Sequence, residues 1–214
     1  MRICAISDTH NQHNKVHIPK CDILIHAGDE SFRGTKAEIE EFAKWFDKQN
    51  AEHLVWVPGN HSLVFQADLP YSVEWFKRHS PRANILINQA ITIDNLKIWG
   101  SPATPYFMNW AWNYNRGSQI KAIWDTIPLD TDVLVTHGPP YRILDGVSPG
   151  TLREQHVGCQ DLAERVLQVK PKFHIFGHIH ECYGRQIFQD TTYINASIVD
   201  EYYAVSNDPV IIDL

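Results

Sequence analysis

Five short apolar runs of this sequence each lead into polar side chains that can bind a metal ion or move a proton. The runs and their polar ends read "AISDTH", "IHAGDE", "VPGNH", "VTHG" and "FGHIH". The candidate side chains that they deliver are Asp8, His10, Asp29, Asn60, His61, His137, His178 and His180. Carboxylate, imidazole and amide ligands without a thiolate suit Mn²⁺, Fe²⁺, Co²⁺, Ni²⁺ or Zn²⁺. The residue types therefore predict a site for divalent metal ions.

The number of candidate ligands favours two ions over one. Apart from His61, the set exceeds what a single tetrahedral ion uses, but it suits two ions that share a bridging carboxylate. Two unit charges about 4 Å apart repel by ~4 kcal/mol at an effective dielectric of about 20, and two dications repel by roughly four times as much. A shared carboxylate offsets this repulsion. Paired ions of this kind clamp an in-line displacement at phosphorus, so the ligand set predicts phosphoryl chemistry.

The apolar runs are typical of buried strands that end in loops. The predicted strands lie in "RICAIS", "DILIHAG", "HLVWVPG", "LKIWGS", "DVLVTHG" and "FHIFGH". In α/β sheets, ligands bind at the rim formed by the carboxyl ends of the strands. Side chains of extended chain alternate with a period of two, so we expect Asp8 and His10 to point the same way. We expect the same of His178 and His180, so that each pair reaches into one site.

Helical patterns lie between the predicted strands. Thr35 and Glu38 form a capping box, and apolar residues recur with helical spacing from Ile39 onward. Similar spacing predicts a helix over 120–127, before Pro128, and another over 162–169. The stretch "AITIDNLKIWG" predicts a hairpin, so part of the sheet is antiparallel. These elements predict one layered α/β domain over 1–214, with helices outside one or two central sheets.

The bulk composition narrows the class of protein. A chain of 214 residues with 43% hydrophobic and 21% charged residues is typical of a globular domain. A net charge of −6 disfavours nucleic acid as the main partner. We find no signal-peptide pattern and no apolar run of membrane-spanning length, and therefore expect no membrane partner. The four cysteines have no paired spacing, which predicts a reduced, cytoplasmic protein.

The order of the motifs adds a family resemblance. "SDTH", "GD", "GNH", "THG" and "GHIH" resemble the signature of the calcineurin-like metallophosphoesterases, from Asp8 to His180. "GSPATP", "THGPP", "VGC" and "FGHIHECYG" resemble the small single-domain subfamily that includes metallophosphoesterase domain-containing proteins. Some animal members of that group carry glycine in place of the first histidine of Gly-His-x-His, whereas this chain keeps His178. The resemblance implies a four-layer α/β/β/α sandwich with mixed central sheets.

The resemblance also implies a role for each matching residue. The first metal would be held by Asp8, His10 and His180, and the second by Asn60, His137 and His178. Asp29 would bridge the two ions, Mn²⁺ being the expected metal and Fe, Zn, Ni or Co the alternatives. A bridging hydroxide would attack phosphorus. Asn60 would also position a phosphate oxygen, and His61 would stabilise developing charge or protonate the leaving alkoxide.

Other histidines and arginines have less specific interpretations. His26 and His174 lie inside apolar runs and are predicted to be hydrogen-bonded core residues, whereas His13, His17, His53 and His79 are predicted to lie at the surface. His13 is close enough in sequence to Asp8 to face the site instead. His156 is either a substrate contact or a surface residue. Arg33 and Arg142 either steer a phosphate or are exposed and solvated.

The stretch "YFMNWAWNYNRG" is unusually aromatic. Trp110 and Trp112, with Tyr106, Phe107 and Tyr114, could form a platform on which a nucleobase stacks. A packed loop or a contact between two subunits of a homodimer is the alternative interpretation. The sequence does not decide between these two.

The leading hypothesis is a metal-dependent phosphodiesterase that hydrolyses a small phosphodiester or nucleotide, with 2′,3′- or 3′,5′-cyclic nucleotides as candidates. A phosphomonoesterase or nuclease on the same scaffold is the second hypothesis. A binding scaffold that keeps the fold but has lost catalysis is the third. The complete ligand set favours the first two over the third.

Overall fold

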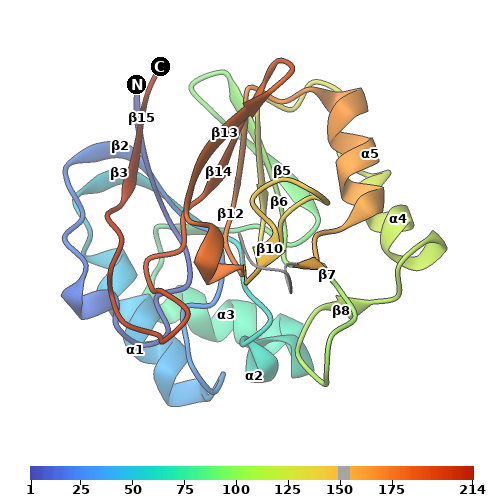
Figure 1. Cartoon of the computed structure of the whole chain (residues 1–214). Coiled ribbons are helices and arrows are strands. Elements are labelled where there is room, and N and C mark those ends of the chain that lie inside the picture. The colour runs from blue at the N-terminus through green and yellow to red at the C-terminus, as the bar shows by residue number, and fades with distance from the viewer. Residues whose placement is uncertain (149–154) are drawn as a thin grey trace.

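The computed structural model describes residues 1–148 and 155–214 and is built around two β-sheets (Figure 1). The five-stranded sheet has the order β15-β1-β2-β3-β4. Its strands are β1 (Arg2–Ile6), β2 (Cys21–His26), β3 (Ala51–Trp56), β4 (Ala83–Ile85) and β15 (Val210–Asp213). Strands β1 to β4 pair in parallel, and β15 joins the edge antiparallel to β1. The carboxyl ends of four strands therefore meet at one rim.

The six-stranded sheet has the order β13-β14-β12-β9-β6-β5. Its strands are β5 (Gln89–Ile93), β6 (Leu96–Ser101), β9 (Val133–Thr136), β12 (Phe173–Phe176), β13 (Gly184–Phe188) and β14 (Thr191–Asn195). The four central strands are parallel, and β5 and β13 are antiparallel edge strands. The predicted hairpin is confirmed: β5 and β6 join at Asp94 and Asn95, which adopt φ values of 45° and 67°.

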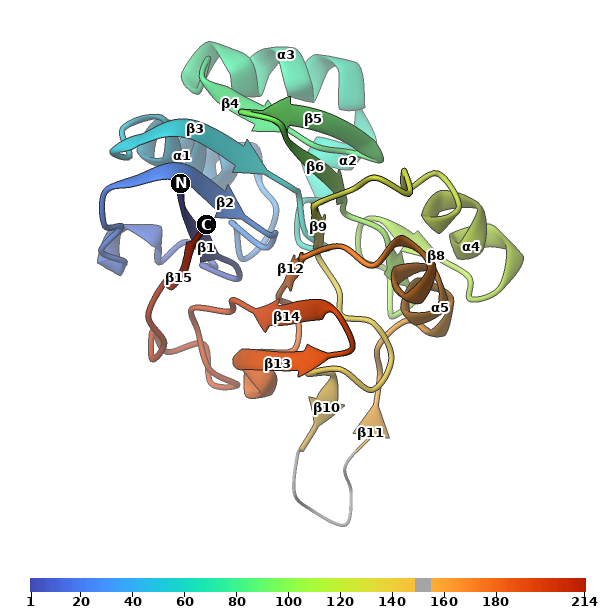
Figure 2. The same cartoon turned by 90° about the horizontal axis from the view of Figure 1, so that it is seen from above.

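Helices cover the outer faces of the two sheets. They are α1 (Lys36–Asp47), α2 (Leu63–Ala67), α3 (Leu69–His79), α4 (Ser118–Trp124) and α5 (Gln160–Val169). Figure 2 shows α4 and α5 together at one side of the molecule, away from α1 and α3. The predicted capping box is present at α1, where Thr35 and Glu38 bond reciprocally. The helix predicted over 120–127 ends at Trp124, because Thr126 turns back to bond the Ile123 carbonyl.

Short elements complete the fold. They are the 3₁₀ helices η1 (His13–Lys15) and η2 (His180–Cys182) and the strands β7 (Thr104–Pro105), β8 (Asn113–Tyr114), β10 (Gly146–Val147) and β11 (Gln155–His156). Within the described residues, none of the helices is long and apolar enough to cross a bilayer.

Three apolar clusters separate four layers. Along β1, Ile3 and Ala5 belong to the cluster between the two sheets, whereas Cys4 and Ile6 belong to the cluster beneath α1 and α3. A third cluster joins the other face of the six-stranded sheet to α4 and α5. Because side chains along β1 alternate between the two faces of its sheet, this strand contributes apolar side chains to the core on both faces. The predicted α/β/β/α sandwich with mixed sheets is confirmed.

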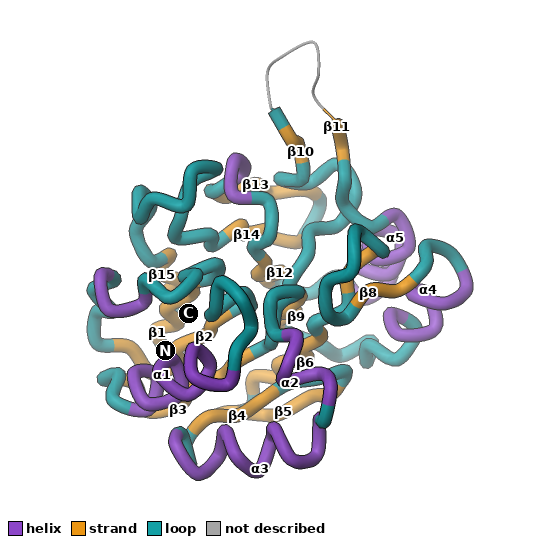
Figure 3. The backbone as a smooth tube through the Cα atoms, turned by 90° about the horizontal axis from the view of Figure 1, so that it is seen from below, coloured by secondary structure: helices purple, strands orange, loops and turns teal. Residues whose placement is uncertain are grey.

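The loops after the parallel strands meet where the two sheets approach each other. The N–H of Gly177, after β12, donates to the carbonyl of His137, after β9, at 3.0 Å. Ser7 and Ser197 form a bridge between the two sheets. From below, Figure 3 shows loop segments in teal lying in front of the strands. Loops from both sheets therefore bound one site.

Gly177 is required by a close approach of two strand ends. A Cβ atom there would lie 2.0 Å from Asp8 Oδ2 and 2.2 Å from Ser7 Oγ. We predict that Gly177→Ala lowers the free energy of unfolding by about 1–3 kcal/mol, because these buried atoms cannot move apart freely. Urea denaturation measures the change. Gly138→Ala is the matched control, since its Cβ meets Thr104 only at 3.4 Å. Equal stability of the two variants would contradict the prediction.

Candidate metal centre

The turns that carry the candidate ligands have left-handed backbone conformations. Asp8, His10 and Asp29 have φ values of 53°, 39° and 55°, and His178 has a φ of 71°. Such conformations are uncommon for residues other than glycine and cluster at functional sites. The expectation that extended chain directs Asp8 and His10 together was therefore wrong in its reason, because both lie in a tight turn. Their side chains nevertheless converge.

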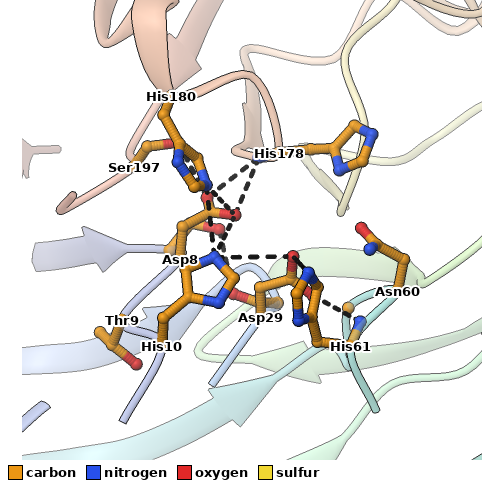
Figure 4. A network of polar contacts seen from close by, with 12 residues as sticks. Asp8, Thr9, His10, Asp29, Asn60, His61, His178, His180 and Ser197 are labelled. Atoms are coloured by element: carbon orange, nitrogen blue, oxygen red, sulfur yellow. Dashed lines mark hydrogen bonds and ion pairs between the residues drawn. The ribbon is translucent and has the colours of Figure 1, made fainter. Parts of the chain in front are cut away.

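The first cluster of ligand atoms is formed by Asp8, His10 and His180. The Nε2 atoms of His10 and His180 lie 3.3 Å apart, and Asp8 Oδ1 lies 3.5 Å from His180 Nε2 and 4.0 Å from His10 Nε2. Ligands about 2 Å from a shared ion lie roughly 3–3.5 Å from each other in tetrahedral geometry. Figure 4 shows these side chains pointing toward one another. The two separations from His180 Nε2 lie within this tetrahedral range, and the 4.0 Å between Asp8 and His10 lies just outside it.

The second cluster is formed by Asp29, His137 and His178. His137 Nε2 lies 3.2 Å from Asp29 Oδ2 and 2.8 Å from the side-chain oxygen of Asn60. His178 therefore belongs to a different cluster from His180, although both follow β12. The expected common direction of this pair is wrong, because His178 is left-handed and His180 begins the 3₁₀ helix η2.

Asp29 is shared by two groups of candidate ligand atoms: besides the second cluster, it forms a third group with His10 and His61. Its Oδ2 atom is 3.2 Å from His137 Nε2 and 3.9 Å from the Nε2 atoms of both His10 and His61. Its Oδ1 atom accepts the backbone N–H of His61 at 2.8 Å. A carboxylate at this place can contact ions on both sides. Its position agrees with that of a bridging ligand.

The imidazoles are oriented by backbone carbonyls. The ring atom Nδ1 of each of four histidines lies 2.6–3.1 Å from a carbonyl oxygen. The pairs are His10 with Ser31, His61 with Phe32, His137 with Ala27, and His180 with Asp200. This arrangement is typical of metal-binding histidines, because the Nδ1–H bond leaves the Nε2 lone pair free for a metal. In neutral His10 and His180 these lone pairs face each other, a contact that a cation between them would relieve.

Electrostatics in the cluster favours positive charge. Burial by itself would raise the pKa of Asp29, but the charges of His137 and His61 hold it well below its usual value. Burial would lower the pKa of His137, but the attraction of Asp29 raises it to about 9. Burial dominates at His10 and lowers its pKa to about 4. The donor set therefore fits divalent cations, which would take the place of the His137 proton.

Two buried histidines form hydrogen bonds that support the turns carrying the candidate ligands. His26 accepts the N–H of Gly28 at 3.3 Å through Nδ1, so its Nε2–H donates to Thr9 Oγ1 at 3.0 Å. In the other sheet His174 Nε2 lies 2.8 Å from Thr136 Oγ1, whose hydroxyl donates to the carbonyl of Gly138. Burial lowers the pKa of both histidines to about 3, so they are neutral. Both are buried and hydrogen-bonded, as their apolar runs predict.

We predict that Thr9→Val weakens binding of Mn²⁺ by about tenfold, because supporting hydrogen bonds orient metal ligands. Thr9 lies between Asp8 and His10, and valine keeps its shape without the hydroxyl. Calorimetric titration of the metal-free protein with Mn²⁺ measures the affinity. Thr126→Val, which removes a hydroxyl-to-carbonyl bond in the exposed turn that follows α4, serves as the control. Equal affinities for the two variants would contradict a supporting role of the Thr9 hydroxyl.

Glu30, next to Asp29, is a buried carboxyl that forms no ion pair within the described part of the chain. Burial raises its pKa to about 7, although Ser62 and Ser31 donate hydrogen bonds to it. A carboxyl whose pKa rises from 4.5 to about 7 on folding destabilises the fold increasingly as the pH rises through that window. At pH 8 in metal-free protein, this lowers the free energy of unfolding by an amount on the order of 3 kcal/mol.

We therefore predict that Glu30→Gln stabilises the metal-free protein at pH 8 and has a much smaller effect at pH 5. Glutamine keeps the shape but cannot ionise. Thermal denaturation at the two pH values, in the presence of a chelator, measures the difference. Glu52→Gln, whose parent side chain is 75% exposed, should change neither value. A pH-independent effect of Glu30→Gln would show that ionisation is not its cause.

A cavity of about 550 Å³ opens over the two clusters. Its floor includes His10, Asp29, Asn60, His61, His178 and His180. Part of its wall is formed by Tyr106, Phe107, Met108 and Trp110 from the segment between β7 and β8. Trp112 is instead buried in the core beneath α1 and α3, so the interpretation of Trp112 as part of a stacking platform is wrong. Its backbone is left-handed, with a φ of 57°.

The remaining candidates lie away from the described cavity lining. Arg33 and Arg142 are exposed, and neither is among the described residues that line the cavity. His156 bonds Asp145 at 2.7 Å and is exposed in β11. His13 is fully buried rather than at the surface, because η1 turns its ring onto Trp45 of α1, with centroids 5.1 Å apart. The prediction of a surface His13 is therefore wrong.

Several residues in or beside the cavity are not predicted from the sequence. Tyr203 packs edge-on to His10 and His180, and Arg116, Glu181 and Glu201 also line the cavity. Ser197 donates to Asp8 Oδ2 at 2.8 Å. Its place just beyond a strand end could have indicated Ser197. No sequence signal distinguishes Tyr203, which reaches the site only through the loop that follows β14.

A sandwich of this kind with paired Asp/His clusters at its rim defines a metallophosphoesterase. The family model described as calcineurin-like phosphoesterase matches residues 1–182, and the chain belongs to that family. It is 35% identical over 233 residues to human metallophosphoesterase domain-containing protein 1. The matched region covers 100% of this chain and 71% of the human protein. The chain is accordingly a hydrolase of phosphoric esters, from a family that normally binds divalent metals.

Two solved structures share the fold. The phosphopantetheinyl hydrolase of Mycobacterium tuberculosis superimposes on this chain with a TM-score of 0.66 and 16% sequence identity. The match covers 94% of this chain and 90% of the hydrolase. An archaeal phosphodiesterase has a TM-score of 0.50 at 17% identity, over 99% of this chain and 100% of that one. At these identities the likeness concerns the fold alone.

Proposed function

We propose that this chain is a metal-dependent phosphodiesterase that acts on small phosphodiesters, with 2′,3′- or 3′,5′-cyclic nucleotides as the candidate substrates. The observation that carries the proposal is the set of adjoining ligand clusters at the floor of the cavity, in which Asp29 groups both with His137 and His178 and with His10 and His61. We take residues 1–214 as a single domain. The cysteine pattern, with Cys4, Cys21 and Cys159 buried and not in disulfides, supports the cytoplasm as its compartment.

The proposed cofactors are two divalent ions, with Mn²⁺ as the first candidate and Fe, Zn, Ni or Co as alternatives that the nitrogen-and-oxygen ligand set also suits. The first would be held by Asp8, His10 and His180, and the second by Asn60, His137 and His178. Asp29 would contact both. When bound, the ions supply Lewis acidity toward the phosphoryl oxygens and lower the pKa of water.

Asn60 and His61 contribute the chain's own polar groups to the reaction. The side-chain oxygen of Asn60 points toward His137, so its amide N–H groups are directed away and can donate to a phosphoryl oxygen. His61 keeps Nδ1 on the Phe32 carbonyl, and in its protonated form it presents Nε2–H toward the cavity. That proton can pass to the leaving-group oxygen.

The charge of the cavity wall supports a small diester over a monoester or nucleic acid. Within the described cavity wall, Glu181 and Glu201 accompany one cationic side chain, Arg116, so that the two carboxylates outnumber the guanidinium and disfavour a second negative charge on the substrate. A phosphodiester carries one such charge, whereas a monoester dianion carries two. The net charge of −6 likewise provides no general attraction for a polyanion.

We predict that the wild-type protein loaded with Mn²⁺ hydrolyses bis-p-nitrophenyl phosphate and that Asp29→Ala abolishes this activity. Removal of the shared carboxylate leaves the charges of two ions without their common counter-charge, so the variant should also bind fewer than two ions by metal analysis. Asp130→Ala, a change at a side chain that is 71% exposed, is the control and should keep both properties. Equal turnover by wild type and Asp29→Ala would overturn the proposal.

The same preparation decides the substrate class. Cyclic nucleotides, simple diesters, phosphomonoesters and single-stranded DNA are compared at equal concentration. Preference for cyclic nucleotides is the expected result. A preference for monoesters or DNA would contradict the assignment as a phosphodiesterase for small substrates.

A further inference from the structure

His61, the proposed proton donor, is held on several sides. Its Nδ1 lies 2.6 Å from the Phe32 carbonyl, and its backbone N–H bonds Asp29. The indole of Trp110 is stacked on its ring, with centroids 4.1 Å apart and an angle of 22° between the planes. The ring of His10 packs edge-on at 4.7 Å. His61 is consequently only 7% exposed.

Trp110 is anchored to the same turn as His61. The N–H of the next residue, Ala111, donates to the Asn60 carbonyl at 2.9 Å. Trp112 follows and is buried in the core beneath α1 and α3. The indole therefore keeps a fixed place relative to His61, although Trp110 lies in a segment whose preceding residues are exposed.

The stack restricts a motion that the hydrogen bonds leave free. The bond to the Phe32 carbonyl constrains Nδ1, but small rotations about the Cα–Cβ and Cβ–Cγ bonds can still tilt the ring and displace Nε2. An aromatic ring lying nearly parallel to the imidazole opposes this rotation, because the two faces would have to separate. Trp110 also lines the cavity, so it covers that face of His61 against water.

We propose that Trp110 is a positioning residue for His61, which directs Nε2–H at the leaving-group oxygen. This inference rests on the proposed phosphodiesterase function. Hydroxide forms a new P–O bond, and the bond from phosphorus to the leaving oxygen breaks. That oxygen keeps the electron pair and takes the Nε2 proton, so the products are a monoester and an alcohol. His61 then regains a proton from solvent.

The test uses methyl aryl phosphates whose leaving phenols differ in acidity, with Mn²⁺-loaded protein. A good leaving group such as p-nitrophenolate departs without a proton, whereas a poor one needs it. We expect Trp110→Leu to lower kcat about tenfold for the poorest leaving group and far less for p-nitrophenolate, with KM little changed. The plot of log kcat against leaving-group pKa should steepen toward that of His61→Gln. Trp110→Phe, which can still stack, should restore most of the loss.

Phe107→Leu is the matched comparison, because Phe107 lies in the same segment and lines the same cavity. We expect it to change KM without steepening the leaving-group plot. A second readout does not use activity: in metal-free protein, the NMR signals of the His61 ring protons should carry the ring-current shift of the indole. The shift should vanish in Trp110→Leu and persist in part in Trp110→Phe.

The outcomes separate the two proposals. Hydrolysis by Trp110→Leu with the wild-type dependence on leaving group would overturn the positioning role and leave the phosphodiesterase proposal standing. An absence of hydrolysis by the wild-type protein would overturn the proposed function, and the positioning role with it. Wild-type ring-current shifts in Trp110→Leu would contradict the stack itself.

Discussion

The structure depends on the concentration of acceptor atoms at one buried point. Asp8 and Asp29 are buried carboxylates, and the imidazoles around them turn their Nε2 atoms inward because their Nδ1 atoms are committed to backbone carbonyls. Such a group of lone pairs and negative charges is unfavourable in a low-dielectric interior unless positive charge lies among them. In the absence of metal the protonated His137 supplies part of that charge. Divalent ions would supply it in full.

The sandwich makes this concentration possible. Two mainly parallel sheets end at a common rim, so ligands far apart in the sequence arrive there on short turns. The turns are strained, with left-handed backbone at Asp8, Asp29 and His178, and glycines at 177 and 59 leave room for the carboxylates of Asp8 and Asp29. Paired buried histidines and threonines hold the turns from behind. These supporting hydrogen bonds therefore help to hold the strained ligand turns in place.

The reaction site extends beyond the ligands through His61. Its backbone bonds Asp29, its ring is stacked on Trp110, and the segment of Trp110 forms a wall of the cavity. The same residue thus contacts Asp29, the proposed bridging carboxylate, on one side and the cavity wall on the other. In the proposed reaction this continuity would link phosphoryl chemistry at the floor to the position of the leaving group above it.

The sequence by itself determined the candidate ligands, strands β1, β2, β3, β5, β6, β9 and β12, helices α1, α4 and α5, and the layered fold, because those signals are local: apolar periodicity, a capping box at Thr35 and polar residues just past strand ends. It did not predict helix α3 or strands β14 and β15. The tertiary structure alone decided how the ligands divide. His178 and His180 share one motif yet join different clusters, since backbone dihedrals in a tight turn depend on packing. It also buried His13 and separated Trp110 from Trp112, because contacts between distant segments leave no periodic trace in the sequence.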